Sequence, residues 1–131
     1  MPVDVATVMA QKAERSVWEG VYSENQAARG RETYRRSCGA CHAADLTGSE
    51  GPSLRGGSFF GRWERQTVGE MLLTIETSMP LGMPGSLDPR DYIDIVAFIL
   101  KENGLPARSG GLPPDPEQLN SFLITAQPPK Q

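Results

Sequence analysis

The stretch Cys38-Gly39-Ala40-Cys41-His42 contains both cysteines and the single histidine of the 131-residue chain. The pattern C-x-x-C-H is the attachment site of a covalently bound haem. In such a site the two thiols add to the vinyl groups of the haem as thioethers, and the histidine ligates the iron. Two intervening residues let one turn present both sulfurs to the same edge of the macrocycle. The motif therefore predicts one haem c, attached through Cys38 and Cys41 and ligated by His42.

Other interpretations of this motif fit the chain less well. A structural zinc site needs four protein ligands, whereas the chain has only three cysteine and histidine residues in total, so a closed site would need a carboxylate or a second chain. A thioredoxin-like C-x-x-C accompanies a βαβ pattern, and the surrounding sequence does not have one. A disulfide between Cys38 and Cys41 would close a very small loop and leave His42 without a role.

The composition favours one domain that is completed by a cofactor. Hydrophobic residues make up 38 % of the chain, which is low for a core of this size, and the 14 glycines and 11 prolines indicate much loop. An apolar haem would supply part of the missing core. The net charge of −3 argues against a general nucleic-acid binder, which usually carries a basic face.

The sequence contains no segment that resembles a membrane span or a signal peptide. No stretch approaches the ~18 consecutive apolar residues of a membrane-spanning helix. The first residues, Met1-Pro2-Val3-Asp4, have no signal-peptide pattern. We expect that an export signal has been removed ahead of this sequence, because haem c is attached outside the cytosol.

Three helices are indicated by their N-terminal residues. Capping boxes at Ser23–Gln26 and Thr67–Glu70 predict two helix starts, and the first of these helices should cover residues 24–37. The third helix should begin after Asp88, with Pro89 at its first position, where a missing N–H costs nothing. The fold class that we predict is therefore all-α, with three or more helices around one haem.

The remaining segments are rich in glycine and proline. We predict extended loops over residues 43–62 and 78–85, and in the tail we expect regular structure only near residues 117–122. The predicted organisation is an N-terminal arm over residues 1–22, a haem domain over residues 23–105 and a proline-rich extension, packed on the domain or trailing from it, over residues 106–131.

A histidine-ligated haem iron has a sixth coordination position that is either filled or open. Thioether is a common sixth ligand and raises the reduction potential. Met79 and Met83 lie in the loop before the third helix, and such a loop can bring sulfur to the haem face opposite His42. Spacing alone does not separate these two methionines, and both could instead fill gaps in the core.

Three segments outside the C-x-x-C-H motif carry a resemblance to a known family. Gly30-x3-Tyr34-x3-Cys38 leads into the motif, Gly51-Pro52-Ser53-Leu54 follows it, and Met79-Pro80 precedes the last helix. On these residues the chain resembles the class I c-type cytochromes of the short bacterial kind, over roughly residues 17–125. The resemblance implies that the first and last helices cross near Gly30, with Tyr34 against Phe98.

The resemblance also implies roles around the haem. Pro52 should back the ligating histidine, Leu54 should touch the ring, and Met79 rather than Met83 should be the second iron ligand. Trp63 has two interpretations, because its indole could donate to a haem propionate or simply belong to the core. Ala43 stands where such cytochromes often have glycine, and we expect this difference to have little consequence.

These features predict a one-electron carrier and not an enzyme. No general base or nucleophile accompanies the motif, and the chain has no second histidine for a distal acid–base role. The alternative is a haem enzyme or a gas sensor with an open sixth position.

The flanking segments suggest a biological setting. Residues 17–22 and 103–106 are similar to a subgroup that accompanies periplasmic dehydrogenases, including quinoprotein dehydrogenases. This similarity implies a periplasmic location and redox-protein partners. We expect a quinoprotein dehydrogenase as electron donor and a terminal oxidase or another cytochrome as acceptor, with no nucleic acid and no membrane span.

Overall fold

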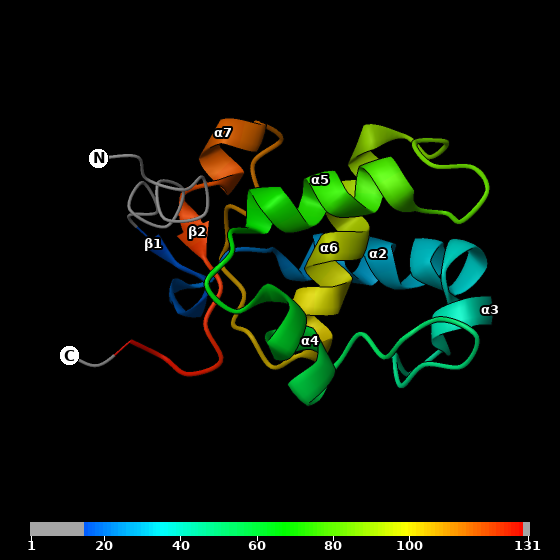
Figure 1. Ribbon diagram of the computed structural model, residues 1–131. Helices are drawn as coiled ribbons and strands as arrows, with labels where there is room; N and C mark the ends of the chain where they lie inside the picture. Colours follow the sequence, from blue (N-terminus) through cyan, green and yellow to red (C-terminus); the bar gives the residue numbers. More distant parts are fainter. Residues whose placement is uncertain (1–14, 130–131) are drawn as a thin grey trace, which may run out of the picture.

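The computed structural model describes residues 15–129, and it is all-α apart from one pair of very short strands (Figure 1). In chain order the elements are β1 (Arg15–Ser16), the 3-10 helix η1 (Val17–Glu19), α2 (Glu24–Ser37), α3 (Gly39–His42), α4 (Gly56–Trp63), α5 (Val68–Ser78), α6 (Pro89–Glu102), α7 (Pro116–Leu119) and β2 (Phe122–Leu123). None of the helices in this part of the chain is long and apolar enough to cross a membrane.

The three helices that the sequence predicts are present, and they begin at the predicted residues. Ser23 and Thr67 are the N-caps of α2 and α5, and each takes part in a complete capping box. Asp88 caps α6 by accepting a hydrogen bond from the Arg90 backbone N–H, and Pro89 occupies the first position of the helix. Local hydrogen bonding therefore fixes where each helix starts.

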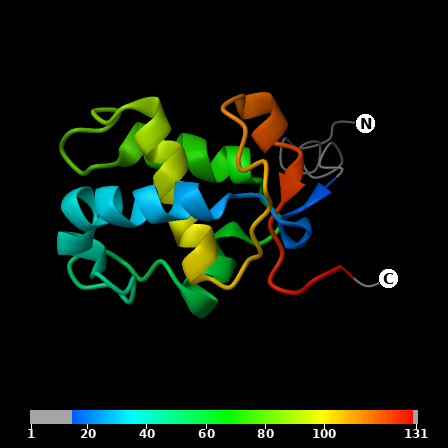
Figure 2. The ribbon, with the colours of Figure 1, turned by 180° about the vertical axis from the view of Figure 1, so that it is seen from behind.

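Helices α2 and α6 cross in close contact, as the resemblance implied (Figures 1 and 2). A Cβ atom on Gly30 would overlap the backbone carbonyl of Asp94, so only glycine permits this approach. Tyr34 lies against Phe98, with ring centroids 5.2 Å apart. At the same crossing Arg29 Nε donates to the buried Asp94 carboxylate at 3.0 Å.

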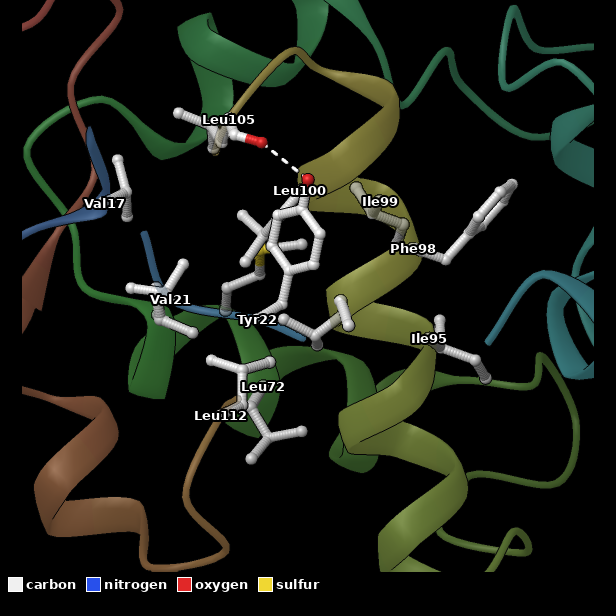
Figure 3. Close-up of a cluster of buried hydrophobic side chains, with 14 of the residues drawn as sticks. Val17, Val21, Tyr22, Leu72, Ile95, Phe98, Ile99, Leu100, Leu105 and Leu112 are labelled. Carbon is white, nitrogen blue, oxygen red and sulfur yellow. Dashed lines mark hydrogen bonds between the residues drawn. The ribbon is translucent and has the colours of Figure 1, made fainter. Parts of the chain in front are cut away.

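Helix α6 is the centre of the hydrophobic core. Residues 94–100 of this helix are all buried. In Figure 3, Tyr22, Leu72 and Leu112 lie on one side of α6, whereas Phe98 points to the other side. The Tyr22 hydroxyl donates to the Leu105 carbonyl oxygen at 2.6 Å, so a segment before α2 is bonded to the segment that follows α6.

The prediction of an extended loop over residues 43–62 is wrong for its last part, which is helix α4. Three of the eight residues of α4 are glycines, and this composition hides the helical signal in the sequence. Phe59 and Trp63 are one turn apart and both are buried. Their packing against the core stabilises a helix that intrinsic propensity alone would not favour.

The two ends of the described chain pair with each other. Strands β1 and β2 are parallel, with Arg15 opposite Phe122, and they lie at the end of the molecule opposite α3 in Figures 1 and 2. Beyond β2, the Ile124 N–H donates to the Gln66 carbonyl oxygen at 2.8 Å. The tail thus lies along the segment between α4 and α5. Residues 1–14, the rest of the predicted arm, are outside the described residues.

Candidate cofactor site

A partly enclosed cavity of about 520 Å³ is bordered by α3, α4, α5, α6 and the loops after α3 and α5. Its volume lies within the roughly 300–1,000 Å³ that is usual for small-molecule and cofactor sites. Most of the side chains on its wall are apolar or small, and they include Tyr34, Cys38, Cys41, His42, Pro52, Leu54, Phe59, Trp63, Met71, Ile75, Met79, Leu81, Ile95 and Ile99. The cavity therefore fits a large, mostly apolar group.

The structure brings the three reactive residues of the motif to one wall of this cavity. Helix α2 ends at Ser37, and Cys38 joins it to the single turn of α3, which carries Cys41 and His42. Both thiols are free. Burial raises the pKa of the Cys38 thiol to about 11, so this sulfur is protonated at neutral pH in the unmodified chain.

The loop after α3 fixes the imidazole of His42. Nδ1 of His42 lies 2.7 Å from the carbonyl oxygen of Pro52. A carbonyl oxygen only accepts hydrogen bonds, so Nδ1 carries the proton and the lone pair of Nε2 is free to bind a metal. A Cβ atom on Gly51 would lie 2.8 Å from His42 Cε1, so glycine at this position lets the loop pack directly on the ring.

The residue after His42 is more constrained than its small side chain suggested. Ala43 has φ 72° and ψ 151°, a conformation that is essentially restricted to glycine. Its carbonyl oxygen accepts a hydrogen bond of 2.6 Å from the buried Tyr34 hydroxyl. The expectation that alanine has little consequence here is therefore wrong, because a Cβ atom strains this backbone.

Pro52, Leu54 and Trp63 all border the cavity. Trp63 is 7 % exposed, and the Arg62 guanidinium lies 4.0 Å from the centroid of one of its rings. Among the described residues, none accepts a hydrogen bond from the indole N–H of Trp63. Burial agrees with a core role, and an indole N–H without a partner among the described residues agrees with a propionate contact.

Asn103 supports the wall of the cavity, a role that the sequence did not indicate. The side-chain amide of Asn103 donates to the Leu54 carbonyl oxygen at 3.0 Å, and its oxygen accepts from the Gly56 N–H at 2.8 Å. An asparagine at the end of a helix is a common C-cap, so the sequence carries no signal for this contact between distant segments.

The methionines differ in their relation to the cavity. Met79 lies on its wall at the end of α5, whereas Met83 is 65 % exposed and does not border it. Met71 also borders the cavity, from within α5, and is 1 % exposed. The structure thus separates Met79 from Met83, which spacing in the sequence could not do.

Residues 25–99, more than half of the chain, match the family model described as cytochrome C oxidase, cbb3-type, subunit III. This protein belongs to that family of cytochrome c domains. Membership establishes a class I cytochrome c-like, all-α fold and haem-based electron transfer, and the family implies haem c. The two cysteines of this cytochrome c domain, three positions apart on the cavity wall, are compatible with that cofactor.

A solved structure has the same fold. The crystal structure of the sulfane dehydrogenase SoxCD from Paracoccus pantotrophus contains a chain that is similar to this cytochrome c domain with a TM-score of 0.53 and 21 % sequence identity. The similarity covers 94 % of the present chain and 66 % of that chain. No curated protein sequence matches this cytochrome c domain significantly.

Proposed function

We propose that this cytochrome c domain is a one-electron carrier whose single haem c is attached through Cys38 and Cys41 and ligated by His42 and Met79. The observation that carries the proposal is the shared cavity, which is lined both by the residues of the motif and by Met79. When bound, haem c supplies a one-electron Fe(III)/Fe(II) couple. Ligation by both His42 and Met79 would leave no coordination position on the iron for a substrate.

The protein residues bind, orient and enclose the group. The hydrogen bond from His42 Nδ1 to the Pro52 carbonyl oxygen fixes the orientation of the ring and makes Nε2 a better ligand. Leu54 and Phe59 are apolar wall residues that limit access of water. A thioether from Met79 would raise the reduction potential relative to a nitrogen ligand. Trp63 and the neighbouring Arg62 are candidates to pair with propionates.

The setting that we propose is the periplasm. The domain would accept electrons from a dehydrogenase, a quinoprotein dehydrogenase being the class that the flanking segments favour, and pass them to a terminal oxidase or another cytochrome. Similarity to a chain from a sulfane dehydrogenase structure agrees with a dehydrogenase as redox partner. The domain itself would not be an enzyme.

The haem-loaded protein tests this proposal in two steps. Intact mass after acid–organic extraction should equal the polypeptide plus one haem. The oxidised protein should have the near-infrared charge-transfer band of a thioether on Fe(III), and the reduced protein should not bind carbon monoxide. Loss of haem on extraction would contradict covalent attachment. A high-spin spectrum with rapid carbon monoxide binding would favour the alternative, a haem enzyme or gas sensor with an open sixth position.

Methionine variants identify the ligand. Met79→Ala should lose the thioether band, lower the reduction potential and allow carbon monoxide to bind. Met83→Ala is the matched control from the same loop, and Met71→Leu is the control from the same cavity wall; both should keep the band. Loss of the band in either control alone would move the ligand to that residue and contradict the assignment of Met79.

A further inference from the structure

The loop that joins α5 to α6 carries Met79 but has few buried side chains of its own. Residues 81–86 are all exposed, and the large apolar side chains of Leu81 and Met83 are 82 % and 65 % exposed. Packing of the loop tip therefore contributes little to the position of the chain at Met79. Whatever fixes this position must act at the ends of the loop.

One buried hydroxyl contacts both ends of the loop. Tyr92 lies in the first part of α6 and is 2 % exposed. Its Oη donates to the carbonyl oxygen of Met79 at 2.8 Å and accepts from the backbone N–H of Leu87 at 3.4 Å. A tyrosine hydroxyl has one proton to donate, and here that proton goes to the main chain of the proposed ligand residue.

The helix that holds Tyr92 is well anchored. Residues 94–100 of α6 are buried, and the close contact at Gly30 fixes α6 against α2. The Met79 carbonyl oxygen accepts a further, longer hydrogen bond of 3.4 Å from Gly85 within the loop itself. The hydrogen bond from Tyr92 therefore connects the Met79 carbonyl group to the core, whereas the bond from Gly85 connects it only to another loop residue.

We propose that Tyr92 is a positioning residue that holds Met79 so that its sulfur stays on the iron. This inference rests on the proposed ligation by Met79. A fixed carbonyl group restricts the main chain from which the methionine side chain would reach the iron, so the sulfur would compete better with outside ligands. Removal of an outer contact of this kind typically weakens metal ligation by about 10- to 100-fold.

Tyr92→Phe in the haem-loaded protein tests this role, because it removes only the hydroxyl. Titration of the oxidised variant with imidazole, followed by loss of the thioether band, should give an affinity for imidazole about tenfold or more above wild type. Tyr22→Phe is the matched control. Tyr22 is 3 % exposed and its hydroxyl also donates to a backbone carbonyl oxygen, but this is the carbonyl oxygen of Leu105, at 2.6 Å, which lies outside the loop that carries Met79. The Tyr22→Phe protein should bind imidazole with wild-type affinity even if its thermal stability is lower.

The possible outcomes separate this inference from the proposed function. A wild-type protein without a thioether band would contradict ligation by Met79 and the inference with it. A wild-type band together with the same imidazole affinity in Tyr92→Phe, Tyr22→Phe and wild type would overturn the positioning role alone. If Tyr92→Phe does not fold, hydrogen exchange in the wild-type holoprotein tests whether the Tyr92 hydroxyl holds the loop. Slow exchange of the Leu87 amide supports the contact, and exchange as fast as at exposed Gly82 overturns it.

Discussion

At the scale of single residues, the turn around His42 combines strain with close packing. Ala43 has a backbone conformation with φ 72° that a side chain disfavours, at a typical cost of about 1–3 kcal/mol. The Tyr34 hydroxyl holds the carbonyl group of the same residue. The local chain is therefore kept in an unfavourable conformation by the surrounding structure, directly beside the proposed iron ligand.

This strain predicts that Ala43→Gly stabilises the haem-loaded protein. Glycine adopts this conformation without a clash but loses more entropy on folding, so the net gain should be about 1 kcal/mol in the free energy of unfolding. Chemical denaturation measures it. Ala44→Gly is the control, because Ala44 has no positive φ, and it should be neutral or destabilising. Equal effects of the two substitutions would contradict strain at Ala43.

Gly51 should be sensitive to a single added methyl group. A Cβ atom there would lie 2.8 Å from Cε1 and 3.0 Å from Nδ1 of His42, so Gly51→Ala must displace the ring or the loop. We expect a loss of about 1–3 kcal/mol in the free energy of unfolding, together with a change in the reduction potential. Gly57→Ala is the control, since a Cβ atom at Gly57 meets nothing within 4 Å. A Gly51→Ala protein that matches this control would disprove the contact.

At the scale of secondary-structure elements, the capping residues predicted where three helices begin. The caps at Ser23, Thr67 and Asp88 gave the correct starts of α2, α5 and α6 because each cap satisfies backbone donors within its own helix. Helix α4 could not be predicted in this way. It depends on burial of Phe59 and Trp63 against residues that are distant in sequence, and its glycines indicate a loop.

The glycines of α2 and α4 have different surroundings, and this difference predicts opposite effects of alanine substitutions. Gly30→Ala should destabilise the protein by at least about 1–3 kcal/mol through overpacking, because the new methyl group would overlap the Asp94 carbonyl group. Gly61→Ala in α4 should instead stabilise it by about 0.5–1 kcal/mol, since nothing lies within 4 Å of that position. Thermal or denaturant unfolding of the holoproteins measures both. Effects of the same sign would contradict the close crossing of α2 and α6 or the open surface at α4.

At the scale of the whole molecule, the candidate site was easier to predict from sequence than the course of the chain ends. The site depends on a contiguous motif whose spacing carries its own chemistry, so Cys38, Cys41 and His42 could be named at once. For the second ligand the resemblance favoured Met79 over Met83, and the structure adds that Met79 borders the cavity whereas Met83 does not. The pairing of β1 with β2 could not be predicted from the sequence, because strands of two residues are too short to have an alternating hydrophobic pattern.

The two ends of the described part of the chain contribute core residues on the side away from the motif (Figure 1). Val17 and Ile124 are fully buried, and the Trp18 indole N–H donates to the Thr125 carbonyl oxygen at 2.9 Å across 107 residues of sequence. The Arg65 N–H donates to the Ile124 carbonyl oxygen at 2.7 Å, just after α4. Because of these contacts, we expect the tail through residue 125 to unfold together with the helices around the cavity.

Phe122→Ala tests this cooperativity in the full-length holoprotein. Phe122 is 1 % exposed and the Arg15 guanidinium lies 4.7 Å from its ring centroid, so the truncation should cost about 3–5 kcal/mol. Because the tail is bonded to the segment that follows α4, the helical circular dichroism and the haem absorption should lose their native values in one transition at a lower denaturant concentration. Gln127→Ala, at an exposed position, should leave the transition unchanged. If Phe122→Ala instead left the haem transition at the wild-type midpoint, the proline-rich extension would be a separate unit that contributes nothing to the stability of the haem domain.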